Sequence, residues 1–575
     1  MNTEYKLYPL PQEIDYFNLA VDLPKAIKID TEINLSEAML ERFGKALASK
    51  SIELNDDASF RINLKIDPKL SKRVDAYKLK IEDNSISINA VNIFALYYGL
   101  NSLLQILDQC DDVAQSIEIN DYADYPIRGI IEGYYGIPWG QEKRKSLIEF
   151  GSRFKMNVFA FAPKDDPYHR EKWFDRYPQV ELDEIGELAR YAYDRGVVYY
   201  WTIAPFLKDE HEITFENKES SLQLILDKFE QLYNAGVRGF GVLGDDVGEL
   251  DVETVVFLMS EINKWRKEKG DVRELMFCPE AYTIEDWAFK DGSELNYYDK
   301  HLDEDIHIFY TGIEVCSPLD AENIEAYKTI KTEDNNRRRD PLFWMNWPVN
   351  DIDHEEKRRL FMGPGEVYEP GIAEVTGVLT NPMEQAEASK TAIFATADYS
   401  WNAEAFSAEE SWQYGFKYIE PACPEALHEI TKHLASQEGR GAKNSAKESV
   451  QIELLEIEHK NAISEDDKRL IELKLKDAYR IILEAVDVYQ ENKSNLELYN
   501  EIEAFVHALR DKSEAAILYI DSISQGDKEL LQEAANRLRI ANDHKISSNT
   551  KNQLYAEPGA KVINNNIKYL QELVE

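Results

Sequence analysis

The chain has 575 residues, a formal net charge of −41 and a hydrophobic fraction of 43%. This length exceeds a single hydrophobic core and predicts about two to four domains. The charge argues against nucleic acid and anionic membranes as partners, and mildly against a polyanionic substrate such as hyaluronan.

The four cysteines lie far apart in the sequence, without a CxxC pair. This spacing indicates reduced, mostly buried thiols, with neither a disulfide nor a metal site. The first 20 residues lack an apolar signal core, and no run of 18 apolar residues occurs. We therefore expect a cytoplasmic protein that does not cross a membrane, although a trimmed form of a secreted protein would have the same features.

Residues 1–124 are predicted to form an N-terminal α/β domain. The segments 61–66, 76–81 and 85–90 alternate or run apolar as strands do, and residues 92–107 carry apolar side chains at helical spacing. This region has no cluster of candidate catalytic residues, so we expect it to have a packing role.

Residues 125–420 are predicted to form a (β/α)8 TIM barrel, which places the chain in the α/β fold class. Short apolar runs recur, each followed by a polar segment compatible with a helix, as in parallel strands covered by helices. Eight such units in succession are the number in a TIM barrel. The runs cover residues 128–136, 157–163, 197–205, 239–246, 274–282, 307–313, 342–348 and 375–382.

Residues 421–575 are predicted to form a C-terminal helical bundle. Proline is absent between Pro424 and Pro558, and residues 471–489 carry an apolar stripe with steps of four and three, as in an amphipathic helix. Further stripes occur at residues 495–523 and 527–541. The sequence leaves open whether the bundle binds a partner, lines a cleft or only stabilises the barrel.

Nearly every predicted barrel strand ends in a carboxylate, amide, hydroxyl or aromatic side chain. In TIM barrels the carboxyl ends of the strands form the face that carries the active site. Sugars require this mixture, because polar groups bind the hydroxyls and aromatic faces cover the apolar side of the ring. The candidate residues are Gly133, Lys164, Asp245, Asp246, Cys278, Tyr282, Thr311, Val315, Trp344, Asn346, Asp351 and Asn381.

Asp245 and Asp246 are adjacent carboxylates at the end of the fourth run. Repulsion between the two charges favours protonation of one of them. A protonated acid beside an anion is what acid–base cleavage of a glycosidic bond or a similar acetal requires. Two solvated loop acids would give the same pattern in so acidic a chain, but the other strand ends favour the catalytic interpretation.

Other catalytic signatures are missing from the sequence. It contains no HExxH pair, no GxSxG elbow, no Walker loop and no dinucleotide-binding glycine pattern, so we predict no metal and no cofactor. His169 is a lone histidine and is expected to be structural. The run from Arg337 to Arg339 is expected in a solvated loop, with charge-based binding of hyaluronan as the weaker interpretation.

Five motifs, taken together, resemble those of glycoside hydrolase family 84, which contains the O-GlcNAcases and bacterial enzymes long described as hyaluronidases. The motifs are IEGYYGIPW (131–139), FAPKDDPYHR (161–170), GVLGDDVGEL (241–250), WMNWPVND (344–351) and LTNPMEQAEASK (379–390). They occur in order over roughly residues 125–400, and the regions on either side also resemble those of bacterial members.

The resemblance implies a retaining exo-β-N-acetylglucosaminidase that removes terminal β-linked GlcNAc from a glycan or glycoprotein. It implies substrate-assisted catalysis, in which the acetamide oxygen of the sugar attacks and forms an oxazoline intermediate. Asp245 then corresponds to the acid that orients the acetamide N–H. Asp246 corresponds to the general acid that protonates the leaving oxygen and later acts as base on water.

The resemblance also implies how the remaining candidates surround the sugar. It implies that Gly133 and Lys164 contact ring hydroxyls, and that Cys278, Tyr282 and Trp344 form the walls of the acetamido pocket. Polar contacts to the sugar or its acetamide are implied for Asn346, Asp351 and Asn381. Thr311 and Val315 are implied to belong to a loop that lines the site.

Two residues depart from the expected pattern. Glu249 adds an acid near the barrel mouth, either as a helix-start residue favoured by the helix dipole or as a determinant beyond the first sugar. Tyr310 is a candidate for shaping the aglycone side. The alternative functions are an endo-acting hyaluronidase and a catalytically silent carbohydrate-binding protein. The natural aglycone and the oligomeric state stay unknown from the sequence.

Overall fold

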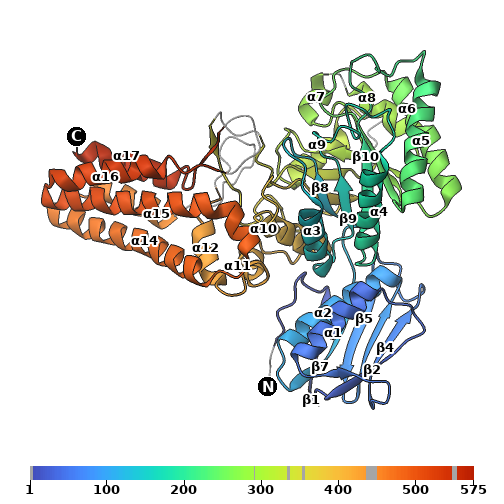
Figure 1. The fold of residues 1–575 in the computed structure, drawn as a ribbon, viewed down its shortest axis with the longest axis horizontal. Coiled ribbons are helices and arrows are strands. Elements are labelled where there is room, and N and C mark those ends of the chain that lie inside the picture. The colour runs from blue at the N-terminus through green and yellow to red at the C-terminus, as the bar shows by residue number, and fades with distance from the viewer. Residues whose placement is uncertain are drawn as a thin grey trace.

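The computed structural model describes residues 4–289, 292–332, 337–351, 356–435, 450–546 and 553–574. It has an N-terminal sheet domain, a closed eight-stranded barrel and a C-terminal helical region, which confirms the predicted fold class (Figure 1). The domain boundaries predicted after residues 124 and 420 stay predictions. Within the described ranges, no helix has both the length and the hydrophobicity needed to cross a membrane.

The N-terminal domain is a mixed sheet covered by two helices. Its strand order is β1-β7-β5-β6-β4-β2-β3. The strands are β1 (Glu13–Asp22), β2 (Ala26–Asp30), β3 (Glu53–Leu54), β4 (Phe60–Ile66), β5 (Tyr77–Glu82), β6 (Ser85–Ala90) and β7 (Val113–Asp121), and the helices are α1 (Glu37–Ser49) and α2 (Ile93–Asp108). The three strands and the helix predicted here correspond to β4, β5, β6 and α2.

All eight apolar runs of the central region form barrel strands. They are β8 (Ile127–Glu132), β9 (Val158–Phe161), β10 (Val198–Ile203), β11 (Gly239–Leu243), β12 (Leu275–Cys278), β13 (Ile306–Tyr310), β14 (Leu342–Met345) and β16 (Gly377–Thr380). Each pairs in parallel with its neighbours, and the closed order is β10-β11-β12-β13-β14-β16-β8-β9. Since nearly every strand residue is buried, the runs are mainly apolar in the sequence.

Helices connect the barrel strands and cover the outside of the barrel. They are α3 (Gln141–Arg153), α4 (Gln179–Tyr193), α5 (Lys218–Ala235), α6 (Val252–Lys269), α7 (Ile284–Phe289), α8 (Ser293–His301), α9 (Ala321–Thr329) and α10 (Lys390–Trp401). The side chain of Asp251 caps the start of α6 by accepting a hydrogen bond from Thr254 N. All twelve residues of α10 are buried, because this helix contacts the barrel on one side and other parts of the chain on the rest.

A buried ionic cluster joins the N-terminal domain to the barrel. Lys155 Nζ lies 2.9 Å from Asp121 Oδ2, and Tyr77 donates to the same oxygen over 2.6 Å. Trp401 Nε1 donates to the other oxygen over 2.8 Å. Because both charges are buried, removing one partner would leave the other uncompensated, so the cluster fixes the docking of the two domains.

The arginine run before β14 is not the solvated loop expected from the sequence. Arg338 donates to Asp299 Oδ2 and Asn296 Oδ1, each over 2.6 Å, and Arg339 donates to Asp299 Oδ1 over 3.1 Å. Only Arg337 of the three has a largely accessible side chain. The prediction is therefore wrong for Arg338 and Arg339, because α8 supplies a carboxylate that pairs with both.

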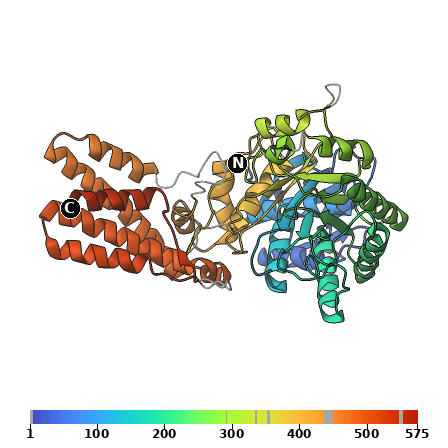
Figure 2. The ribbon, with the colours of Figure 1, turned by 90° about the horizontal axis from the view of Figure 1, so that it is seen from above.

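The C-terminal region consists of helices that project from the barrel to one side, as Figures 1 and 2 both show. They are α11 (Ala408–Ile419), α12 (Pro424–Thr431), α13 (Val450–Asn461), α14 (Glu465–Asn492), α15 (Leu496–Gln525), α16 (Lys528–Ala541) and α17 (Val562–Val574). The predicted stripes lie on α14, α15 and α16. The short strands β15 (Lys357–Arg358) and β17 (Tyr555–Ala556) pair in parallel and tie this region back to the barrel.

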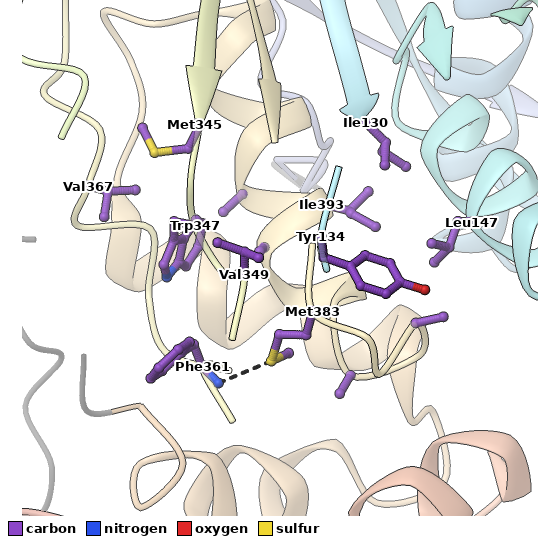
Figure 3. Close-up of a cluster of buried hydrophobic side chains, with 14 of the residues drawn as sticks. Ile130, Tyr134, Leu147, Met345, Trp347, Val349, Phe361, Val367, Met383 and Ile393 are labelled. Atoms are coloured by element: carbon purple, nitrogen blue, oxygen red, sulfur yellow. Dashed lines mark hydrogen bonds between the residues drawn. The ribbon is translucent and has the colours of Figure 1, made fainter. Parts of the chain in front are cut away.

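An apolar cluster supports the loops that leave β8 and β14 (Figure 3). Trp347 and Val349 are each 4% exposed, and Phe361 N donates to Met383 Sδ over 3.3 Å. The polar residues of the same segment, Asn346 and Asp351, are only partly buried. Burial of Trp347 and Val349 therefore fixes the segment and leaves its polar side chains available.

Candidate active site

The twelve candidate residues all line one cavity of about 260 Å³ at the carboxyl ends of the barrel strands. Drug-sized pockets measure about 300–1,000 Å³, so this cavity suits one small unit such as a single sugar. Three further residues complete its wall, and the sequence did not single them out as candidates: Tyr135, Cys316 and Val349.

Asp245 is 8% exposed and makes an ion pair with Lys164 through Oδ2. Its other oxygen, Oδ1, is buried and has no hydrogen-bond partner among the described residues. An unsatisfied buried acceptor costs free energy, about 1–3 kcal/mol and more when it is charged. Asp245 Oδ1 is therefore ready to accept a hydrogen bond from a ligand N–H or O–H.

Asp246 has a different environment, although it is the next residue. Tyr135 donates to Asp246 Oδ2 over 2.6 Å, and Tyr282 donates to Oδ1 over 2.9 Å. Asp246 has a φ of 58°, in the left-handed region, which aspartate tolerates better than most residues. Adjacent residues of a strand face opposite ways, so this turn after β11 is what allows both carboxylates to line one cavity.

Both tyrosines keep their protons at ordinary pH. Burial, and then the hydrogen bond to Asp246, raises the pKa of Tyr135. Burial, and then the charge of Asp246, raises the pKa of Tyr282. A phenol can also accept a hydrogen bond, so either tyrosine can serve a protonated Asp246 by rotating its hydroxyl.

Tyr135 is the clearest residue that the sequence analysis missed. It stands beside Tyr134, which is buried in the core at 1% exposure, whereas Tyr135 is 42% exposed at the cavity mouth. The sequence gives two identical residue types in succession, and only the turn of the loop distinguishes them.

Two amide side chains and two backbone groups form a hydrogen-bonded row across the cavity wall. Gly133 N donates to Asn381 Oδ1 over 3.2 Å, and Asn381 Nδ2 donates to Asn346 Oδ1 over 2.9 Å. Asn346 Nδ2 in turn donates to the Val315 carbonyl over 2.8 Å. The two amides are thus oriented before any ligand arrives.

Gly133 is required by the packing of the wall. A Cβ atom at this position would lie 2.4 Å from Trp344 Cζ2, closer than atoms can approach. Trp344 is 5% exposed, and its Nε1 is buried without a partner among the described residues. Cys278 lies in the same wall, and burial, followed by the charge of Asp245, raises the pKa of its thiol well above the usual range. It is therefore a neutral wall residue.

The other predicted residues lie at the rim or support it. Thr311 is 3% exposed and donates to the Glu314 carbonyl over 3.2 Å, whereas Val315 is 42% exposed. Asp351 Oδ2 accepts a hydrogen bond from Tyr135 N over 2.8 Å. The suggestion that Tyr310 shapes the aglycone side is wrong, because Tyr310 is fully buried and donates to the Asn323 carbonyl over 2.8 Å.

His169 lies near the cavity as a buried, neutral residue. Its Nδ1 is 2.7 Å from the Thr202 carbonyl, and burial lowers its pKa to about 3. Over the residues that the structure describes, no group of three or more His, Cys, Asp or Glu side chains could hold a metal ion.

Family models match two parts of the chain. Residues 128–432 match the model described as β-N-acetylglucosaminidase, which covers the barrel and all twelve candidate residues. Residues 4–122 match the model described as glycosyl hydrolase family 20, domain 2.

Curated relatives resemble the barrel region. Protein O-GlcNAcase from Rattus norvegicus is 30% identical over 284 residues, and the same protein from Mus musculus is 30% identical over 285 residues. Each match covers 47% of this chain and 29% of the relative, so the chain aligns with less than a third of these proteins.

Solved structures resemble the whole chain. CpGH84D is 33% identical, with 99% of each chain covered and a TM-score of 0.89. CpGH84B is 24% identical, with 99% of this chain and 100% of that chain covered and a TM-score of 0.82. A mutant of the Thermobaculum terrenum O-GlcNAc hydrolase is 20% identical over 78% of this chain and 95% of that chain, with a TM-score of 0.65. The last two likenesses support the fold alone.

Proposed function

The chain belongs to the β-N-acetylglucosaminidase family, glycoside hydrolase family 84, and from this premise we propose that it removes terminal β-linked GlcNAc from a glycan or glycoprotein. The proposed reaction is exo-acting and retains the configuration at the anomeric carbon. The proposal rests on the different contacts of the two aspartates. Asp245 has a buried oxygen without a partner among the described residues, and Asp246 accepts hydrogen bonds from two tyrosine hydroxyls.

In the first proposed step, the acetamide N–H of the sugar donates to Asp245 Oδ1. The acetamide oxygen then attacks the anomeric carbon as the bond to the leaving oxygen breaks. Asp246 gives its proton to that oxygen, and the sugar becomes an oxazolinium ion, the protonated oxazoline, whose N–H stays hydrogen-bonded to Asp245. Lys164, paired with the other oxygen of Asp245, stabilises the negative charge that orients the acetamide.

In the second proposed step, Asp246 takes a proton from water as the water attacks the anomeric carbon. The oxazolinium ring opens, and the product leaves as GlcNAc with its original configuration. Two displacements on one carbon give retention, and the acid of the first step acts as the base of the second.

The substrate acetamide replaces an enzyme nucleophile in this scheme. In a retaining enzyme with its own nucleophile, two carboxyl groups flank the sugar about 5–5.5 Å apart. Asp245 and Asp246 leave the same strand end, and one of them is paired with Lys164. This arrangement supports an orienting anion and an acid better than it supports a nucleophile and an acid.

The remaining wall residues are proposed to hold the first sugar. Cys278, Tyr282 and Trp344 would enclose the acetamido methyl, and Asn346, Asp351 and Asn381 would bind hydroxyls or the acetamide. An endo-acting hyaluronidase is less consistent with the structure, because Arg338 and Arg339 are committed to Asp299.

The test compares hydrolysis of an aryl 2-acetamido-2-deoxy-β-glucoside with that of the same aryl β-glucoside. Fast cleavage of the first and none of the second is the expected result. Comparable cleavage of both would mean that the protein supplies its own nucleophile. Cleavage of neither substrate would overturn the proposal. Depolymerisation of hyaluronan in a parallel assay would then support the endo-acting alternative, and no depolymerisation would support the binding-only alternative.

A further inference from the structure

A second and larger cavity opens beside the candidate active site. It has a volume of about 840 Å³ and is lined by residues of three segments, which are the β10–α5 loop, the β11–α6 loop and the start of α8. The helices α5 and α6 directly follow β10 and β11, so their first residues lie at the barrel face that also carries Asp246, and the start of α8 lines the same cavity. Figure 1 shows these helices grouped on one side of the barrel.

The segment from Asp246 to Glu249 contributes residues to both cavities. Asp246 lines the sugar pocket, and Glu249 lines the second cavity. Consecutive Cα atoms are about 3.8 Å apart, so the Cα atoms of these two residues lie within about 11 Å of each other. Lys208, from the far wall, reaches this segment, since its Nζ lies 3.7 Å from the Cβ position of Gly248. The second cavity is therefore adjacent to the residue that is proposed to protonate the leaving group.

The second cavity has an apolar side and an acidic rim. Phe206 and Ile213 line it together with Phe215, whose side chain is 53% exposed although it is aromatic. The charged groups that line it are four carboxylates and one ammonium, namely Glu212, Glu249, Asp251, Glu294 and Lys208. Four carboxylates against one ammonium leave an excess of negative charge beside exposed apolar surface, which suits a side chain with an aliphatic stem and a cationic end.

Only two of these four acidic residues can be explained by a position at the start of a helix. Asp251 caps α6 by accepting from Thr254 N over 3.0 Å, and Glu294 lies in the first turn of α8 and accepts from Tyr298. Glu212 lies in a loop, and Glu249 precedes the cap of α6 by two residues. Both are exposed and lie outside the first helical turn, where the dipole has its effect.

We propose that this second cavity binds the polypeptide next to an O-linked GlcNAc and favours a Lys or Arg two or three residues from the glycosylated Ser or Thr. This inference rests on the proposed function. An extended polypeptide advances about 3.3–3.6 Å per residue, so two or three residues span the distance from Asp246 to Glu249. Phe215 would contact the stem of the basic side chain, and Glu212 and Glu249 would contact its charged end.

The test uses two O-GlcNAc peptides that are identical except for Lys or Glu three residues from the glycosylated Thr. The wild-type protein is expected to show about tenfold higher kcat/KM for the Lys peptide at low ionic strength, with the ratio falling in 0.5 M salt. In the double variant Glu212→Gln, Glu249→Gln, the ratio is expected to fall to within twofold.

The matched control is the double variant Glu216→Gln, Glu253→Gln. Both residues are exposed and neither lines the cavity. Glu216 lies on the same loop as Glu212, and Glu253 lies in the first turn of α6, four residues after Glu249. The net charge changes equally in the two double variants, so the control is expected to keep the tenfold ratio. Equal loss in both double variants would assign the preference to the overall charge and overturn the proposal, as would a wild-type ratio near one.

An aryl 2-acetamido-β-glucoside distinguishes failure of this inference from failure of the proposed function. All variants are expected to hydrolyse it within twofold of wild type, because neither pair of residues lines the sugar pocket. If wild type cleaves the aryl substrate but neither peptide, the polypeptide assignment is wrong and the proposed function stands. If it does not cleave the aryl substrate, the proposed function itself fails.

Discussion

Two neighbouring aspartates in this protein differ in every contact that they make. Asp245 is buried and faces Lys164, whereas Asp246 is exposed and faces two tyrosine hydroxyls. A carboxylate beside a fixed cation is suited to act as the anion that orients an amide N–H. A carboxyl group near solvent, held by groups that both donate and accept, suits proton transfer.

Replacing Asp246 separates its acid role from a structural one. We expect Asp246→Ala to lower kcat/KM about 10²–10⁴-fold for glycosides with poor leaving groups, and far less for activated aryl glycosides, because good leaving groups need little protonation. A series of aryl glycosides of graded leaving-group pKa gives the measurement. The same loss along the whole series would contradict the acid role.

Replacing Asp245 should act on a different step. We expect Asp245→Asn to slow formation of the intermediate about 10²-fold or more, whatever the leaving group, because the acetamide loses its charged orienting group. Pre-steady-state release of the aryl alcohol measures this step. Unchanged kinetics in a folded variant would refute the assignment.

At the scale of the element, the end of β8 depends on a glycine. A methyl group at position 133 would collide with Trp344, which also packs against the Phe309 ring at a centroid distance of 5.1 Å. We expect Gly133→Ala to destabilise the fold by about 1–3 kcal/mol and to raise KM, since the indole would be displaced into the sugar pocket. Thermal unfolding and KM for an aryl substrate give the two measurements.

Gly140→Ala is the matched control for this variant. Gly140 lies in the same β8–α3 loop, with a φ of −69° and nothing within 4 Å of its Cβ position. It should leave KM unchanged and lower stability by only about 0.5 kcal/mol, because Gly140 is the N-cap of α3 and alanine is less favourable there than glycine. An equal effect of the two substitutions would mean that the loop rejects any side chain, and the specific role of Trp344 would be lost.

The barrel strands were predictable because buried strands consist mainly of apolar residues, which can be recognised in the sequence. β10, for example, is buried at all six positions and therefore reads as an unbroken apolar run. The candidate residues were predictable for the related reason that they follow such runs. By contrast, β1 is mostly exposed and lies at the edge of its sheet, so its sequence carries little hydrophobic pattern and it was missed.

The residues that the sequence misplaced depend on distant partners. Arg338 and Arg339 look like solvent-exposed charges until α8 brings Asp299 against them, 39 and 40 residues earlier in the chain. Tyr310, a candidate for shaping the aglycone side, is buried in the core, whereas Tyr135, which was not a candidate, is open at the cavity mouth. No local pattern distinguishes these outcomes, because tertiary contacts decide them.

At the scale of the whole molecule, buried charged groups join the parts of the chain. Glu501 on α15 accepts hydrogen bonds from Glu387 N and Ala388 N, over 2.8 and 3.1 Å. These two residues lie in the loop that follows β16 and that begins with Asn381. Over the described residues, no side chain beyond Asn381 lines the sugar pocket, so the helical region supports that loop from behind.

Asp398 on α10 gives a pH prediction for the assembled molecule. It is 2% exposed and accepts a hydrogen bond from Leu10 N over 3.0 Å, and burial raises its pKa to about 6. Because the folded pKa lies above the unfolded one, the stability from its protonation is fully present below about pH 4. It is lost as the pH rises to about 6 and above.

We therefore expect Asp398→Asn to weaken the decline in stability between about pH 4 and pH 6. At pH 8 the variant should be more stable than wild type by on the order of 3 kcal/mol, the value of a shift of about two pKa units. Thermal unfolding of both proteins at pH 4 and pH 8 provides the measurement. A parallel pH dependence of the two proteins would show that Asp398 does not carry the effect.

The left-handed turn at Asp246 also bears on how the site tolerates motion. The two aspartates share one peptide unit, so they move as one body when the barrel fluctuates. Acids carried on two different strands would drift apart and together with every such fluctuation. In this protein the distances that vary are those from Asp246 to Tyr135 and Tyr282, which lie in the loops after β8 and β12. Thermal motion therefore changes the distances from Asp246 to the two tyrosines, while the Cα atoms of the two aspartates stay about 3.8 Å apart.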